Sequence, residues 1–137
     1  MRFVAGYIAF LAAFGICDAI WLTTMSEKLY RPALGDMLLE RIRYLPAILF
    51  YFGFGLGVIH FAVMPALRDG SGGSALVNGA LLGLLAYATY DLTNYATLRA
   101  WTPTITLADM AYGTLAVGAC SWIAYTVVRQ VEAWGWI

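Results

Sequence analysis

Four long apolar segments constrain the fold of this chain more than any other feature. A helix that crosses the hydrocarbon core of a bilayer needs about 20 largely apolar residues, because each residue adds about 1.5 Å along the axis. Residues 3–25, 44–67, 75–98 and 104–128 each meet that requirement. Of the 137 residues, 62% are hydrophobic and 12% are charged, whereas a soluble domain is about 45–50% apolar. The sequence therefore predicts an all-α integral membrane protein, with residues 1–137 forming a single transmembrane domain.

The connections between these segments predict how the helices are arranged. The second and third connections are short, and short connections place consecutive helices side by side and antiparallel. We therefore expect a four-helix up-and-down bundle. The first connection, residues 26–43, is longer and charged, and Leu34, Leu38 and Ile42 recur in it at helical spacing. This pattern favours a short amphipathic helix at the membrane interface, with a solvated loop containing one helical turn as the alternative.

The distribution of charge predicts the topology. Eight basic residues balance eight acidic ones, so nothing indicates a nucleic-acid partner. The apolar run at the N-terminus continues past Asp18 to Met25, and we interpret it as a retained first span, not a cleaved signal peptide. Lysine and arginine are more frequent on the cytoplasmic side of a membrane protein, which predicts cytoplasmic first and third connections and both termini outside. The basic residues near the first and third connections are Lys28, Arg31, Arg41, Arg43 and Arg99, and those near the opposite side are Arg2, Arg68 and Arg129.

The stretch from Tyr87 to Gly113 is unusual because it carries polar groups inside or beside apolar spans. Asp91, Asn94 and Asp109 lie in it, and Asp18 lies in the first span. Ionisable groups at such depth are costly and are usually retained for a function. Counted from the cytoplasmic ends of the spans at 1.5 Å per residue, all four lie about 6–10 Å deep. We therefore expect them at one level, on three different helices.

The spacing of these residues predicts a polar pocket. Tyr87, Asp91 and Asn94 follow one another at i, i+4 and i+7, so they line one helix face. If that face turns inward, it meets Asp109 and Asp18 in a pocket that opens toward the first and third connections. Aromatic residues of the same level are expected to form its walls or to belong to the interfacial aromatic belt, the belt being the default for Tyr95 and Trp101. The predicted substrate-binding residues are Asn94, Tyr87, Tyr90, Tyr112 and Trp21.

The predicted catalytic groups are the carboxyl groups of Asp91, Asp109 and Asp18. Carboxyl groups that share a partly desolvated site cannot all be ionised, so at least one is expected to hold a proton. One protonated and one ionised carboxyl group are what general acid–base chemistry needs. The structural alternative is that Asp18 bonds a neighbouring helix, and that Asp109 serves the free backbone N–H groups near its helix start.

Metal and disulfide sites are not predicted. His60 stands alone, with no second ligand at metal-binding spacing, and is expected to be a hydrogen-bonded side chain on the face of Gly53 and Gly57. Cys17 and Cys120 differ in depth by about 12 Å on the same count, which is too far for a disulfide between straight helices. The cofactor stays unknown.

Two G-x-x-x-G pairs can mark close helix contacts. Gly79 with Gly83 is one and Gly53 with Gly57 is the other, and such pairs allow close approach of two backbones. Either pair could serve a contact within the bundle or between protomers.

The motifs YATYDLTNYATLRAW (Tyr87 to Trp101), DAIWL (Asp18 to Leu22) and ADMAYG (Ala108 to Gly113) carry a family resemblance. The chain resembles, over nearly its whole length, a family of small bacterial inner-membrane proteins catalogued as domain of unknown function 2177. Tyr112 stands where that family commonly has tryptophan. The resemblance implies a four-helix protein of the bacterial inner (plasma) membrane and supplies no activity.

Three functions are compatible with these features. The first is a pocket protein that binds or modifies a lipid or other hydrophobic small molecule through the Asp, Asn and Tyr cluster. The second is a small proton-coupled transporter that acts as a homodimer, with Asp18 as the proton carrier. The third is an accessory or structural subunit of a larger membrane complex. The first explains best why several acids with aromatic neighbours share one level.

Overall fold

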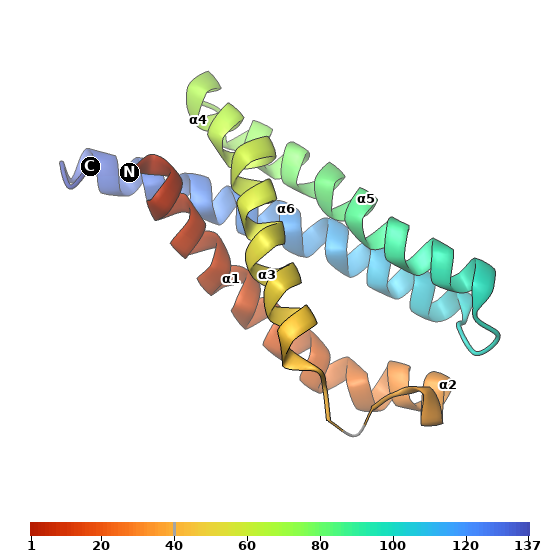
Figure 1. Ribbon diagram of the computed structural model, residues 1–137. Coiled ribbons are helices and arrows are strands. Elements are labelled where there is room, and N and C mark those ends of the chain that lie inside the picture. The colour runs from red at the N-terminus through yellow and green to blue at the C-terminus, as the bar shows by residue number, and fades with distance from the viewer. Residues whose placement is uncertain (40) are drawn as a thin grey trace.

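The computed structural model describes residues 1–39 and 41–137, and this part of the chain contains helices and turns but no strand (Figure 1). Four helical runs are long and apolar enough to cross a membrane. They are Arg2–Met37, Tyr44–Asp69, Gly72–Thr97 and Pro103–Ala133. The last three predicted spans agree with these runs to within five residues, whereas the first run continues 12 residues past the predicted end at residue 25. The all-α membrane fold is confirmed.

Local sequence fixes the starts of the last two helices. Helix α5 (Gly72–Thr97) begins after Ser71, whose hydroxyl oxygen accepts a hydrogen bond from the Ser74 backbone N–H at 3.2 Å. Helix α6 (Pro103–Ala133) begins after Thr102, which caps it in the same way. Such caps satisfy backbone donors that no helical bond can reach. The second and third connections are therefore encoded locally.

Helices α5 and α6 pack closely because glycines line their contact. A Cβ atom added at Gly79 or Gly83 would lie less than 3.0 Å from atoms of α6, and one added at Gly113 would meet the ring of Tyr87. In contrast, a Cβ added at Gly53 or Gly57 would meet nothing within 4 Å. Of the two G-x-x-x-G pairs, only the one in α5 marks a tight contact within the chain.

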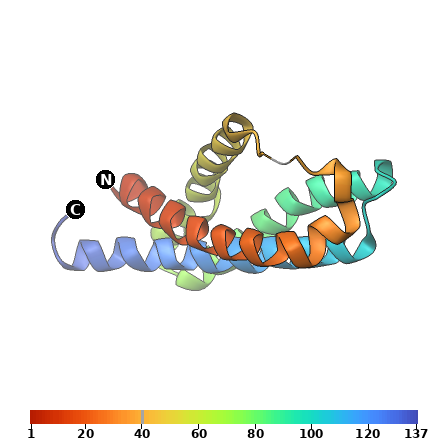
Figure 2. The ribbon, with the colours of Figure 1, turned by 90° about the horizontal axis from the view of Figure 1, so that it is seen from below.

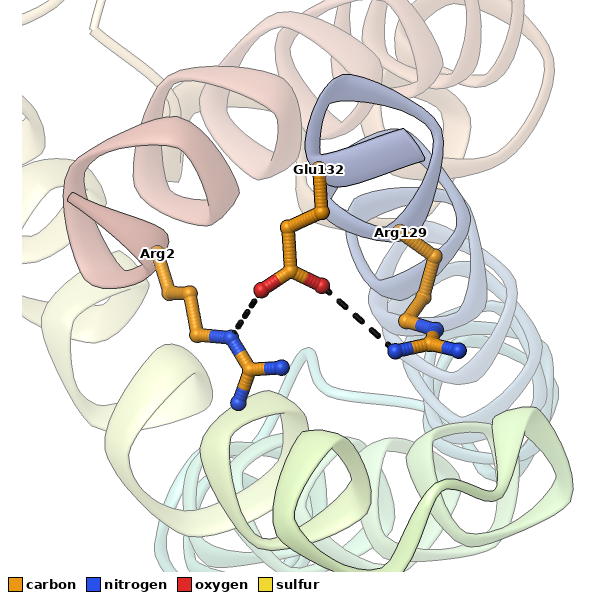
Figure 3. A network of polar contacts seen from close by, with 3 residues as sticks. All are labelled: Arg2, Arg129 and Glu132. Carbon is orange, nitrogen blue, oxygen red and sulfur yellow. Dashed lines mark hydrogen bonds and ion pairs between the residues drawn. The ribbon is translucent and has the colours of Figure 1, made fainter. Parts of the chain in front are cut away.

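Helix α1 (Arg2–Met25) packs against α6 along most of its length. Phe10 and Phe14 of α1 lie in the same buried cluster as Val117 and Val128 of α6. At the end of this pair Glu132 accepts a hydrogen bond from Arg2 and lies 3.5 Å from the Arg129 guanidinium (Figure 3). These contacts hold the two chain termini at the same end of the molecule (Figure 1).

The first connection differs from its prediction. Helix α1 continues through a π-helical turn (η1, Ser26–Tyr30) into α2 (Arg31–Leu34) and a 3₁₀ turn (η2, Gly35–Met37). Figure 2 shows α2, in orange, bending away from the α1 axis. A short helical segment is therefore present between the first two spans, as expected, but it covers residues 26–37 and continues α1 instead of forming a separate helix over residues 26–43. The physical reason is tertiary: Leu34 packs with Trp101 and Ile105, so the apolar side of this segment is covered by protein.

The second membrane run joins the bundle only in its second half. It consists of α3 (Tyr44–Val58), the π-helical segment η3 (Ile59–Val63) and α4 (Met64–Asp69). Val58, Ile59 and Ala62 are fully buried, whereas residues 44–50 are exposed within the chain. The start of α3 accordingly stands apart from α5 (Figure 2). This divergence positions the site described next.

Candidate functional site

Asp91 of α5 and Asp109 of α6 form the centre of the site. Both are buried, with exposed fractions of 0% and 6%, and their side chains are close neighbours. Two buried carboxyl groups at close range cannot both be ionised unless a cation lies beside them, because like charges repel strongly where water is scarce. Within the described part of the chain, neither oxygen of Asp91 has a donor. The pair therefore holds a proton or awaits a donor from outside the chain.

Tyr30 connects the first helical run to this pair. Its hydroxyl donates a hydrogen bond to Asp109 Oδ1 at 2.5 Å and accepts one from Trp21 Nε1 at 3.2 Å. The sequence prediction missed Tyr30 because it assigned residue 30 to a connection outside the span. A signal was present: Leu22, Ser26, Tyr30 and Leu34 follow one another at intervals of four residues, which is one face of a continuous helix.

Asp18 is linked to the centre through Tyr112. The Tyr112 hydroxyl donates to Asp18 Oδ1, and the Tyr112 ring stacks on Trp21 with centroids 4.3 Å apart. Tyr112 also meets Tyr87 edge to face at 6.0 Å. On α6, Tyr112 stands almost one turn further from the loop than Asp109. Asp18 therefore lies deeper than the carboxyl pair, and the expected common level of all four groups is wrong for Asp18, because α1 does not end at Met25.

A cavity of about 710 Å³ adjoins the carboxyl pair. It lies between the first helical run, the start of α3 and α5. Its polar end is formed by Asp109 with the hydroxyls of Tyr30, Tyr87 and Tyr90, and Trp101 lines it too. The apolar part of the wall consists of Leu22, Leu34, Leu38, Leu39, Ile42 and Phe50. Ala86 completes the apolar wall, and Ser26 and Arg31 are its other polar lining residues, so the lining is mostly apolar with one carboxyl group.

A second cavity of about 330 Å³ lies between α1 and α3. Asp18 supplies its acidic group, and Phe50 lines both cavities. Phe14 and Tyr51 contribute to its apolar wall. The two cavities, one lined by Asp18 and the other by Asp109, therefore share Phe50 as a common wall residue.

The structure brings most of the predicted site residues together but gives them different positions. Asp109, Tyr87 and Tyr90 line the larger cavity, and Asp18 lines the smaller one. Asn94 is half-buried next to Tyr90 but does not line either cavity. Trp101, assigned by default to the interfacial belt, is instead 6% exposed and lines the larger cavity. The predicted residues that stand behind the cavity walls are Asp91, Tyr112 and Trp21.

Among the described residues, the three carboxyl groups have no basic partner. Across residues 1–39 and 41–137, no salt bridge reaches Asp18, Asp91 or Asp109. Arg31 lines the larger cavity, but its Nε lies 2.9 Å from Glu27. The same part of the chain shows no group of three or more His, Cys, Asp or Glu side chains that could hold a metal ion. The negative charge of the site is therefore left to protons, tyrosine hydroxyls and any bound molecule.

Two residue placements correct the sequence prediction outside the site. Cys17 and Cys120 have their sulfur atoms 3.8 Å apart, so their predicted separation is wrong. The depth count failed because it began at Met25, whereas the helix continues to Met37. His60 is exposed and packs edge to face on Phe61 at 4.8 Å; among the described residues its side chain has no hydrogen-bond partner, contrary to expectation.

Comparison with known proteins identifies the family. A family described as "Predicted membrane protein (DUF2177)" matches residues 3–126. No curated protein and no solved structure matches the chain. The family match covers nearly all of the first three membrane runs, most of the fourth, and every residue of the site described above. The chain therefore belongs to the DUF2177 family of predicted membrane proteins.

Proposed function

We propose that this protein binds a lipid or other hydrophobic small molecule in the larger cavity and holds its polar end at Asp109. The observation that carries the proposal is an apolar space of about 710 Å³ that ends on a buried carboxyl pair. Cavities that hold small ligands are typically about 300–1,000 Å³, mostly apolar, with a few placed polar groups. This cavity has that size and that distribution of polarity.

The rim of the cavity supports access from the bilayer. Leu39, Ile42 and Phe50 line it and are 52%, 66% and 57% exposed. Exposed apolar side chains at the level of a membrane face lipid tails at no hydrophobic cost. A molecule dissolved in the bilayer therefore reaches the cavity without crossing water. The cavity lies at one end of the bundle, which favours binding over a transport path that crosses the membrane.

The carboxyl pair also supplies the groups for a proton transfer to the bound molecule. Asp109 lines the cavity. Asp91 lies behind Asp109, and the Tyr30 hydroxyl donates a hydrogen bond to Asp109. One carboxyl group can hold the proton that the other lacks, which is the condition for general acid–base catalysis. In this proposal Asp18 positions Tyr112 and does not itself touch the larger cavity.

Filling the cavity tests the binding proposal. Ala86 lines the cavity, whereas Ala96 lies on the exposed side of the same helix. Protein purified in mild detergent would be analysed by native mass spectrometry for bound lipid or other small molecules. We expect a co-purifying molecule with the wild type and with Ala96→Trp, and its loss with Ala86→Trp. Equal occupancy of the two folded variants would reject the proposal.

A lipid profile tests the catalytic part. A strain that lacks the protein would be complemented with the wild type or with Asp91→Asn, which keeps the shape of the side chain. We expect the wild type, but not Asp91→Asn, to restore the lipid composition. If the variant restores it fully, the pair binds without catalysing.

A further inference from the structure

The polar end of the larger cavity combines aromatic rings with a carboxyl group. Tyr30, Tyr87, Tyr90 and Trp101 line it together with Asp109. Tyr90 and Trp101 meet edge to face, with centroids 5.4 Å apart, and these two rings come from α5 and from the turn before α6. Aromatic rings attract cations through the negative charge of their faces. A cation in this space would therefore meet several rings as well as a carboxylate.

The carboxyl pair behind these rings lacks compensation. Asp91 is fully buried and both of its oxygens are without a donor in the described part of the chain. Its neighbour Asp109 receives one hydrogen bond, from Tyr30. The basic side chain on the wall, Arg31, is already paired with Glu27. Buried carboxyl groups without a cation are costly, so a positive charge is what this end of the cavity lacks.

We infer that the larger cavity binds an amphiphile whose polar end is an alkylammonium group. The ammonium lies among the rings of Tyr87, Tyr90 and Trp101 and is balanced by Asp109, with Asp91 behind it. The alkyl chain lies along the leucine wall of the cavity. This inference rests on the proposed function and specifies the chemical class of its ligand.

The same charge distribution disfavours anionic ends. A carboxylate, sulfate or isolated phosphate placed beside Asp109 would add negative charge next to a carboxyl group, and the basic side chain among the described lining residues, Arg31, is paired with Glu27. Like charges at such distances repel strongly where water is scarce. Alkylammonium groups occur in free lipophilic amines and in phospholipid headgroups, and the binding experiment separates the two sources.

The experiment compares amphiphiles that share one tail and differ at the polar end. Purified protein in a maltoside detergent would be titrated with dodecyltrimethylammonium, dodecanol and dodecyl sulfate, with binding followed by native mass spectrometry. We expect the ammonium compound to bind about tenfold more tightly than dodecanol, as cation–π contacts and a carboxylate together allow, and the sulfate not to bind. In a second arm, the binding of lysophosphatidylcholine is compared with the binding of lysophosphatidylglycerol, which lacks the ammonium group.

Each outcome has a distinct meaning. Binding of dodecyltrimethylammonium without lysophosphatidylcholine assigns free alkylammonium compounds, and binding of lysophosphatidylcholine as well assigns the phospholipid headgroup. Equal binding of dodecyltrimethylammonium and dodecanol would overturn the inference while leaving the proposed function standing. Binding of none of these molecules, together with equal occupancy of the Ala86→Trp and Ala96→Trp proteins, would reject both.

Variants locate the preference in the structure. Asp109→Asn removes the charge at nearly constant shape and should reduce the preference for the ammonium compound to near parity with dodecanol. Tyr90→Leu removes a ring that is 58% exposed, so it tests the same site without disturbing the core. Asp69→Asn, at the opposite end of the molecule in α4, is the matched control and should keep the full preference. An Asp109→Asn protein that is folded and retains the preference would contradict the inference.

Discussion

At the scale of single residues, two tyrosines hold the acidic site together. Tyr30 donates to Asp109 and Tyr112 donates to Asp18. Each bond joins the first helical run to α6 and gives a carboxyl group a donor that the surrounding apolar side chains cannot supply. The phenolic hydroxyls therefore serve stability and site geometry at once.

Removing either hydroxyl should destabilise the fold. We expect Tyr112→Phe and Tyr30→Phe each to lower the free energy of unfolding by about 1–2 kcal/mol, near the upper end of interhelical bonds in membranes. Titration with sodium dodecyl sulfate in mixed micelles would measure the change in the free energy of unfolding. Tyr95→Phe is the control, because Tyr95 is 48% exposed and its hydroxyl has no partner among the described residues. A control that loses as much stability as the other two would show that the effect is not specific to these bonds.

At the scale of helices, the α5–α6 pair is the best-packed unit and depends on glycine. Gly83 lies against the Gly113 backbone, so an added methyl group has no flexible neighbour that could move aside. Tight cores resist added atoms, because the neighbours must shift or leave their preferred rotamers.

Alanine substitutions should distinguish the two G-x-x-x-G pairs. Gly83→Ala is expected to cost about 1–3 kcal/mol through overpacking. Gly53→Ala should be neutral or stabilising by up to about 1 kcal/mol, because it gains helix propensity and meets no neighbour. The same mixed-micelle titration measures both. A large loss at Gly53 would instead indicate an intermolecular contact on the outer face of α3.

The register of α1 against α6 gives a second prediction at this scale. The Cys17 and Cys120 sulfurs are 3.8 Å apart, so a membrane-permeant oxidant such as diamide should join them, the two thiol hydrogens passing to the diamide. Burial disfavours the reactive thiolate, so the reaction should be slow. Mass spectrometry should show an intact chain lighter by two hydrogens, and Cys17→Ser should abolish the change. Absence of the bond in the folded protein after prolonged oxidation would contradict this register.

At the scale of the whole molecule, the two ends of the bundle differ in chemistry. One end carries the acidic site and the larger cavity. The other carries both termini and Glu132 between two arginines (Figure 3). We predict that the acidic end faces the cytoplasm of a bacterial cell and that the termini face the periplasm, in line with the excess of basic residues near the first and third connections.

Cysteine labelling tests this orientation. In a background with Cys17→Ser and Cys120→Ser, Asp69→Cys and Asp36→Cys place single exposed thiols at opposite ends. A membrane-impermeant maleimide should label the Asp69→Cys protein in spheroplasts, and the Asp36→Cys protein only after lysis. The reverse pattern would invert the topology.

The sequence by itself determined the four spans, their order and the presence of costly acids near one end. These follow from chain-local physics: apolar length, helix caps at Ser71 and Thr102, and the cost of burying charge. Tertiary structure alone decided that Tyr30 reaches Asp109, that Trp101 turns into the cavity, and that Cys17 meets Cys120. The reason is that each depends on where the first helix ends, and Leu34 extends that helix by packing on Trp101 and Ile105, which are distant in sequence.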